Sequence, residues 1–218
     1  MHKEKVVLVG SGQHARVLIY NIIEQGKYDI ACFTTHDPAL VGTTYEGYEV
    51  GGTDDDVEVL KEKYQTNKFI IAFGDMKKRK KLYEHYVANG WEAITVIHPN
   101  AIVSPNAKIG KGVLIECGCL ITPNPVIGDN VVINTGSQVN HDNIIESHVY
   151  IASGVVLSGG VTIRENSLLD DGVIVSLGHS VGKNSIIGAG GVVTNDIPDN
   201  VIAVGNPARV AKVNEYEK

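Results

Sequence analysis

The sequence predicts a mixed α/β and all-β chain: an N-terminal Rossmann-like parallel sheet, then a parallel β-helix. Two observations predict this order. Residues 1–96 alternate apolar, strand-like runs with helical patterns. From residue 97 a six-residue aliphatic period begins, in a chain with 24 glycines and only 6% aromatic residues. We expect domains at residues 1–96 and 97–196, followed by a C-terminal tail at 197–218.

The first domain is expected to hold four strands and three helices. The strands are predicted at Val6–Val9, Tyr28–Phe33, Phe69–Phe73 and Ala93–Ile97. The helices are predicted after the Gly10–His14 loop, at Asp54–Tyr64 with Asp54 as N-cap, and at Met76–Asn89 with Gly90 closing it. The basic run Lys77–Lys81 is interpreted as a solvated helix face.

The second domain is predicted from its repeat. Every sixth residue from Ile97 to Val193 is Ile, Val or Leu, at all 17 positions. Chance would give this about once in 10⁸ trials if such residues filled one position in three. The residue four places after each anchor is mostly small, and a second period of 18 lies on top. Three short strands per coil therefore stack as a triangular prism of about five coils, about 4.8 Å apart.

Charge and composition exclude several classes. A net charge of −6 and a pI of about 5.7 disfavour nucleic-acid binding. No apolar run approaches the roughly 20 residues of a membrane span, and no signal-peptide core is recognised, so a cytoplasmic location is expected. Cys32, Cys117 and Cys119 match neither a disulfide set nor zinc spacing and are expected to be mainly packing thiols.

A glycine-rich turn, Gly10-x-Gly12, lies between the first strand and the first helix. Such a turn lets the backbone approach a phosphate at a helix N-terminus. An NAD site is disfavoured, because Ala15 replaces the third glycine and no acidic residue closes the second strand. Binding of another nucleotide and a purely structural turn both remain open.

His141 is the sharpest chemical signal in the prism. The 18-residue period puts Gly159 directly above it, one coil away. A histidine base beside a backbone N–H is the pairing that acyl transfer requires, and Asp142 would orient the imidazole. The alternative is a solvated histidine at a turn. His148 and His179 add no three-ligand spacing, so no metal is expected.

Both halves together resemble the sugar O- and N-acyltransferases related to sialic acid O-acetyltransferase and to the nucleotide-linked 4-amino-sugar N-acetyltransferases. The resemblance is carried by Val7–His14, Ile70–Asp75 with Arg79, Ile97–Pro99, the prism, and Gly205–Ala208. It implies a left-handed β-helix and a homotrimer with active sites between neighbouring prisms. Acetyl-CoA would lie along the prism, and the nucleotide sugar would reach in from the Rossmann-like domain.

The resemblance also implies site residues. The catalytic set is His141, Asp142, Gly159 and Asn134. The substrate-binding set is Gly10, Ser11, Gly12, His14, Gly74, Arg79 and Tyr150. The acetyl-CoA set is Gly159, Gly188, Ala189 and Pro207. The chain departs from the family pattern at Gln13, at Thr34–His36 and at Tyr150, which stands where a second histidine is common.

The expected function is acetyl-CoA-dependent N-acetylation of the 4-amino group of a UDP- or dTDP-linked 4-amino-4,6-dideoxy sugar, for polysaccharide biosynthesis. The amine would attack directly, with His141 as base. Three alternatives stay open: a sugar O-acetyltransferase of the sialic acid type, a metal-dependent hydratase on the same prism, and a non-catalytic nucleotide-sugar-binding regulatory subunit.

Overall fold

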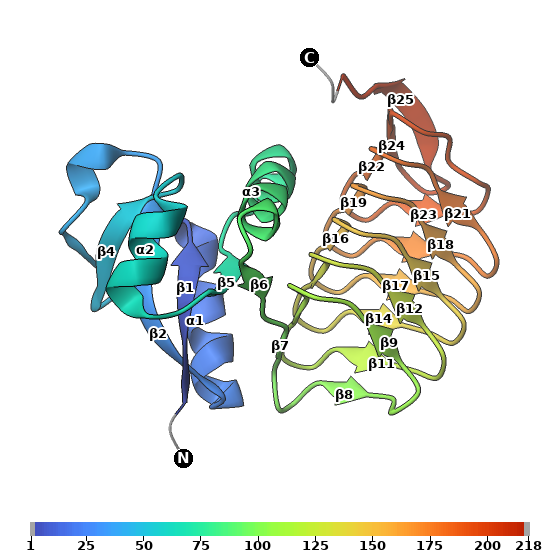
Figure 1. Ribbon diagram of the computed structural model, residues 1–218. Coiled ribbons are helices and arrows are strands. Elements are labelled where there is room, and N and C mark those ends of the chain that lie inside the picture. Colours follow the sequence, from blue (N-terminus) through green and yellow to red (C-terminus); the bar gives the residue numbers. More distant parts are fainter. Residues whose placement is uncertain (1–2, 216–218) are drawn as a thin grey trace. The chain divides into compact units, whose positions relative to one another are not determined.

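The computed structural model describes residues 3–215, so the first two residues of the predicted N-terminal domain and the last three of the predicted tail lie outside the described residues. The chain forms two compact units that divide between Val96 and Ile97. Figure 1 shows an α/β unit and a coiled prism of short strands. No helix among the described residues is both long and apolar enough to cross a membrane.

The first unit is built on one six-stranded sheet, in the order β3-β4-β2-β1-β5-β6. All neighbours are parallel except β3 and β4. The strands are β1 (Glu4–Val9), β2 (Tyr28–Thr35), β3 (Thr44–Tyr45), β4 (Tyr48–Thr53), β5 (Lys68–Ile71) and β6 (Glu92–Ala93). The helices are α1 (Gln13–Gln25), α2 (Val57–Tyr64) and α3 (Met76–Ala88), with a 3₁₀ turn η1 (Pro38–Leu40).

Aromatic rings fill much of the core of the first unit. Phe69 on β5 is fully buried, and its ring centroid lies 4.9 Å from Tyr86 and 6.4 Å from Trp91. Tyr86 belongs to α3, so these contacts attach that helix to the sheet. Trp91 is buried within the same unit.

Three details of the predicted first domain were wrong. Asp54 is not the cap of α2, because its carboxylate accepts a hydrogen bond from Thr34; the N-cap position is Asp56. The predicted strand Ala93–Ile97 divides in two, since β6 joins the first sheet and β7 belongs to the prism. The hairpin of β3 and β4 was not predicted, because its Gly-containing segment lacks a clear apolar alternation.

The prism has three faces, each a stack of parallel strands in 18-residue register. Face one holds β7 (Val96–Ile97), β10 (Leu114–Ile115), β13 (Val132–Ile133), β16 (Tyr150–Ile151), β19 (Leu168–Leu169) and β22 (Ile186–Ile187). Face two holds β8 (Ile102–Val103), β11 (Leu120–Ile121), β14 (Gln138–Val139), β17 (Val156–Leu157), β20 (Ile174–Val175) and β23 (Val192–Val193). Face three holds β9 (Lys108–Ile109), β12 (Val126–Ile127), β15 (Ile144–Ile145), β18 (Thr162–Ile163) and β21 (Ser180–Val181).

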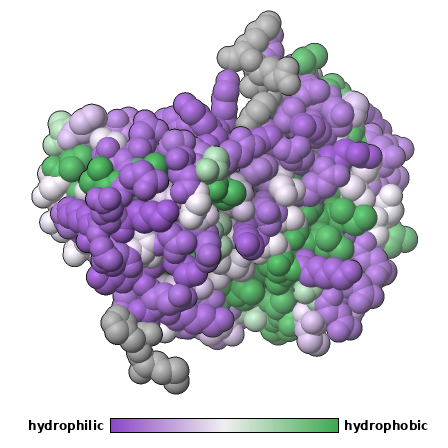
Figure 2. All heavy atoms as spheres, in the orientation of Figure 1, coloured by the Kyte–Doolittle hydropathy of each residue, from purple (hydrophilic) through white to green (hydrophobic). Residues whose placement is uncertain are grey.

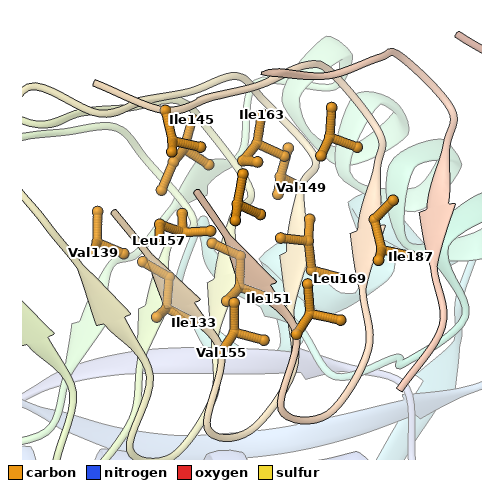
Figure 3. Packing of buried hydrophobic residues seen from close by; sticks show 14 of the residues in the cluster. Ile133, Val139, Ile145, Val149, Ile151, Val155, Leu157, Ile163, Leu169 and Ile187 are labelled. Atoms are coloured by element: carbon orange, nitrogen blue, oxygen red, sulfur yellow. The ribbon is translucent and has the colours of Figure 1, made fainter. Parts of the chain in front are cut away.

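The second residue of most prism strands points inward and the first points outward. Figure 3 shows the inward aliphatic side chains stacked in one continuous core, including Ile133, Ile151 and Leu169 from successive coils of face one. Asn130 and Asn166 adopt left-handed backbone conformations at corresponding turns, a geometry that asparagine tolerates well. The fold is a left-handed parallel β-helix, as expected.

The chain after the last coil remains attached to the prism. β24 (Val201–Val204) pairs with β22 and extends face one, and β25 (Arg209–Val213) pairs antiparallel with β24. Ala203 and Ala208 are buried against the prism core. This segment therefore caps the apolar interior at the C-terminal end of the stack.

Candidate active site

His141 lies at the corner between faces two and three, two residues after β14. His141 lies in a turn, whereas the inward-pointing positions belong to the flanking strands. Its imidazole is therefore on the surface. Its side chain is 60% exposed. A reactive group at this corner is therefore held by a rigid coil while remaining accessible to a substrate.

Asp142 orients the imidazole. His141 Nδ1 lies 3.0 Å from Asp142 Oδ2, and Asn124 donates to the other carboxylate oxygen at 3.3 Å. The hydrogen bond with His141, followed by that with Asn124, lowers the pKa of Asp142 below its ordinary value. Because an ionised carboxylate only accepts, Nδ1 must carry the proton, which leaves Nε2 as the basic nitrogen.

The basic edge of the imidazole faces Gly159. A Cβ atom built on Gly159 would collide with Cε1 and Nε2 of His141, so with the imidazole in this position only glycine fits beneath the ring. Gly160 N–H donates to the His141 carbonyl at 2.9 Å, which keeps the two coils in register. Within residues 3–215 the Gly159 N–H has no hydrogen-bond acceptor. The corner therefore places a base, a carboxylate and a backbone donor together.

Asn134 and Tyr150 lie elsewhere on the same chain, on and beside face one. Asn134 directly follows β13, and Tyr150 points outward from β16, one coil further along. The Asn134 amide donates to the Tyr150 hydroxyl at 3.0 Å. Asn134 Oδ1 is buried and has no partner among the described residues. A single prism thus pairs these two residues with each other and not with His141.

The residues expected to contact acetyl-CoA lie near the C-terminal end of the stack, apart from Gly159. Gly188 follows β22, and a Cβ there would lie 2.9 Å from a methyl group of Val204. Ala189 and Pro207 are exposed. The small side chains at these turns leave the backbone open to an extended ligand.

The glycine-rich turn of the first unit joins β1 to α1. Gly10 has a φ of 105° and is closely covered by the ring of Phe73, so a side chain there is excluded. Gly12 precedes α1, whose first turn has no acidic residue and no side-chain cap. Ser11 between them is half-buried. The N-terminal end of α1 carries the positive end of the helix dipole, which favours an anionic group such as a phosphate.

A buried hydrogen-bond relay positions this turn. The Gly10 N–H donates to Thr34 Oγ1 at 3.0 Å, and that hydroxyl donates to Asp54 Oδ1 at 2.5 Å. Burial raises the pKa of Asp54 above its ordinary value. The relay connects the C-terminal ends of β1, β2 and β4, the edge where open α/β sheets bind ligands.

Arg79 is buried and His14 is half-buried, so neither side chain is fully exposed beside the turn. Arg79 is 2% exposed, and its Nη1 donates to the carbonyl of Ile71 at 2.9 Å. Burial, together with the Arg79 guanidinium, lowers the pKa of His14 to about 4. Gly74, next to this network, is exposed. Arg79 is thus suited to hold the loop after β5 in place.

A cavity of about 310 Å³ opens at the same edge of the sheet. Most of its lining was not predicted from the sequence; the lining includes His36, Asp54, Asp55, Phe73, Lys78 and Lys81. The interpretation of Lys77–Lys81 as only a solvated face was wrong, because Arg79 is buried and two of the lysines line this cavity. One sequence feature could have revealed this lining: charged residues stand at three strand ends and at the start of α3.

Within residues 3–215 no group of three or more histidine, cysteine or carboxylate side chains is arranged to hold a metal ion. His179 is one-third exposed and lies 3.4 Å from Asp196. Cys32 and Cys119 are buried, and burial raises the pKa of Cys119 to about 11.

Comparison with known proteins agrees with both halves of the chain. Residues 5–86 match the family described as the PglD N-terminal domain. The structure is similar to a histidine-to-alanine variant of GDP-perosamine N-acetyltransferase from Caulobacter crescentus, crystallised with CoA and GDP-perosamine. The two are 34% identical with a TM-score of 0.89, over 94% of this chain and 96% of that one. The chain belongs to the sugar O- and N-acyltransferase family of hexapeptide-repeat transferases.

Two curated relatives match this chain over part of their length. GDP-perosamine N-acetyltransferase of Escherichia coli O157:H7 is 32% identical over 112 residues, covering 50% of this chain and 49% of the relative. UDP-N-acetylbacillosamine N-acetyltransferase of Bacillus subtilis is 34% identical over 117 residues, covering 51% of each chain. The matched region thus spans about half the length of each curated relative.

Proposed function

We propose that this protein is an acetyl-CoA-dependent N-acetyltransferase that acylates the 4-amino group of a nucleotide-linked 4-amino sugar. One observation carries the proposal: His141 Nε2 faces Gly159, while Nδ1 is bound to Asp142. Three of the similar proteins are named as N-acetyltransferases of nucleotide sugars, and their named activities support the same chemistry. The cytoplasm, which supplies acetyl-CoA, is the proposed location.

The proposed reaction is a direct attack. The sugar amine adds to the thioester carbonyl, forming the C–N bond, and one amine proton passes to His141 Nε2. The Gly159 N–H donates to the oxygen that becomes negatively charged. The tetrahedral intermediate then collapses with cleavage of the C–S bond, and the departing CoA thiolate takes the proton from the imidazolium. Asp142 stabilises the cationic imidazole and keeps Nε2 pointed at the reacting atoms.

A homotrimer is the proposed assembly, with the active sites between neighbouring prisms. Several large apolar side chains stay exposed on strand faces and at a corner turn of the prism: Ile102, Val126, Ile144, Ile174 and Leu177. Figure 2 shows hydrophobic residues gathered on the exposed surface there. Exposed apolar patches of this kind mark interfaces between chains. A neighbouring prism would supply a second set of side chains, such as Asn134 and Tyr150, to the His141 corner.

Light scattering on the purified chain tests the assembly. The expected result is a trimer for the wild type and a smaller species for Ile144→Lys, because a charge on face three opposes burial. A monomeric or dimeric wild-type protein would contradict the proposed assembly.

Release of free thiol from acetyl-CoA tests the function. The acceptors are nucleotide-linked 4-amino sugars carrying GDP, UDP or dTDP, together with sialic acid and plain hydroxy sugars. Release with a 4-amino sugar is the expected outcome. Release only with a hydroxyl acceptor would instead assign an O-acetyltransferase, and nucleotide-sugar binding without CoA binding would assign a regulatory subunit.

A further inference from the structure

The cavity of the first unit carries chemistry that distinguishes nucleotide bases. It lies where β2 and β4 end and α3 begins, and its walls come from Thr35 and His36, from Asp54 and Asp55, and from Lys78 and Lys81. Phe73 adds an aromatic ring, which is half-buried and packed over Gly10. Flat aromatic surfaces are suited to stacking against a nucleotide base.

Both hydrogen-bond acceptors and hydrogen-bond donors line this cavity. Asp54 is 8% exposed and forms part of the wall; its Oδ1 is already engaged by Thr34. Asp55 is exposed to the cavity, and within residues 3–215 its carboxylate has no hydrogen-bond or ion-pair partner. The side chain of Lys78 likewise forms no hydrogen bond in the described part of the chain, although it lies close enough to Asp54 to affect its titration. Carboxylate and ammonium groups are thus both available to a ligand.

We infer that the nucleotide of the substrate is a guanine nucleotide, with Asp55 accepting from the base and Lys78 donating to it. This inference rests on the proposed function, whose substrate carries a nucleotide. Guanine presents adjacent N1–H and N2–H₂ donors, which match the two oxygens of one carboxylate. Its other edge presents O6 and N7 acceptors, which a lysine ammonium binds.

The other bases fit this lining less well. The Watson–Crick edge of adenine pairs its amino donor with the N1 acceptor, which an acceptor-only carboxylate repels. Uracil and thymine have one N–H flanked by two carbonyl oxygens, so a carboxylate gains one hydrogen bond and opposes two lone pairs. The cavity therefore favours a GDP-linked sugar over the UDP- or dTDP-linked sugar expected from the sequence.

Titration calorimetry of the full chain with free GDP, UDP, dTDP and ADP tests this inference. The expected dissociation constant for GDP is lower than that for UDP by at least about tenfold, the size of one bidentate base contact. Binding of UDP or dTDP as tight as GDP, or no binding of any nucleotide, would overturn the inference.

The Asp55→Asn variant assigns the contact. The amide replaces one acceptor oxygen with a donor, so GDP affinity should fall about tenfold or more, while UDP affinity changes less than threefold. Asp29→Asn is the matched control, because Asp29 is an exposed carboxylate near the opposite end of β2; GDP affinity should be unchanged. Equal losses for GDP and UDP in Asp55→Asn would overturn the assigned role.

Thiol release separates the two proposals. Acetyl transfer to a UDP-linked amine but not a GDP-linked one would overturn the guanine assignment and leave the transferase intact. Preferential GDP binding with no thiol release from any acceptor would overturn the transferase and leave the guanine cavity.

Discussion

The two units of this chain are built on different kinds of core. The interior of the prism is almost wholly aliphatic, and each layer contacts a near copy of itself 18 residues away. The first unit instead packs Phe69, Tyr86 and Trp91 around a single sheet, with no internal repetition. A substitution in a repeated core changes only one of many similar layers, so such a core tolerates it. A core without repeats depends on each of its large aromatic rings.

The same contrast holds for their polar groups. In the prism, His141 and Asp142 lie at a corner between two faces, where both side chains are about 60% exposed. The first unit buries Thr34, Asp54 and Arg79 in networks that shape a cavity. The prism is thus suited to present a reacting group on a rigid surface, and the first unit to recognise a ligand by enclosing it. Four predictions, ordered by the size of the expected effect, test this contrast.

The largest effect is expected on stability, from Ile163→Ala in β18. Ile163 is fully buried in the prism core, so its truncation should lower the free energy of unfolding by about 2 to 5 kcal/mol. Urea denaturation measures this loss. Thr162→Ala changes the outward neighbour on the same strand and should cost much less. Equal losses would contradict the inward and outward assignment.

His141→Ala should lower the turnover number at least about 100-fold, because a general base contributes that much to such reactions. Stability should change little, since the side chain is exposed. The measurement is the rate of thiol release from acetyl-CoA. His179→Ala is the matched control, because His179 is a prism histidine that also lies beside a carboxylate. A turnover number near that of the wild type in His141→Ala would remove His141 from the mechanism.

Acidification should destabilise the first unit through His14. The folded state holds the pKa of His14 near 4, against 6.5 for the free side chain, so the unfolded chain binds a proton first as the pH falls. Stability due to His14 is therefore present above pH 6.5 and is lost towards pH 4, by about 2 kcal/mol between pH 7 and 5.

Urea denaturation at pH 7 and pH 5 checks this loss in the wild type and in His14→Gln. The variant should lose about 2 kcal/mol less than the wild type on acidification. His36→Gln, which changes an exposed histidine of the same unit, is measured alongside as the matched control. Identical pH dependence in all three proteins would show that His14 does not titrate in this way.

Gly159→Ala should have the smallest effect of the four, about a tenfold loss of turnover. The added methyl group would meet the imidazole of His141, and that side chain can swing away without a backbone shift. The melting temperature should stay near that of the wild type, while the turnover number falls. Unchanged turnover would show that close contact between these two residues is not required.

The sequence predicted the prism in more detail than the first unit. A strict period converts sequence separation into position, so the approach of Gly159 to His141 followed from counting 18 residues, and the structure confirms that contact. In the first unit the same reasoning found β1, β2, β5 and α3 but misassigned Asp54 and missed β4. No period relates these elements, and their pairing depends on long-range contacts.

By itself, the sequence determined the six-residue coil, its aliphatic core and the corner that carries His141, because each of these depends on local periodicity. Only the tertiary structure decided the relay from Gly10 to Asp54, the burial of Arg79 and the cavity beside Asp55 and Lys78. These features join residues from three strand ends and a helix, and a hydrogen bond or cavity between distant segments has no signature in the sequence around any one of them.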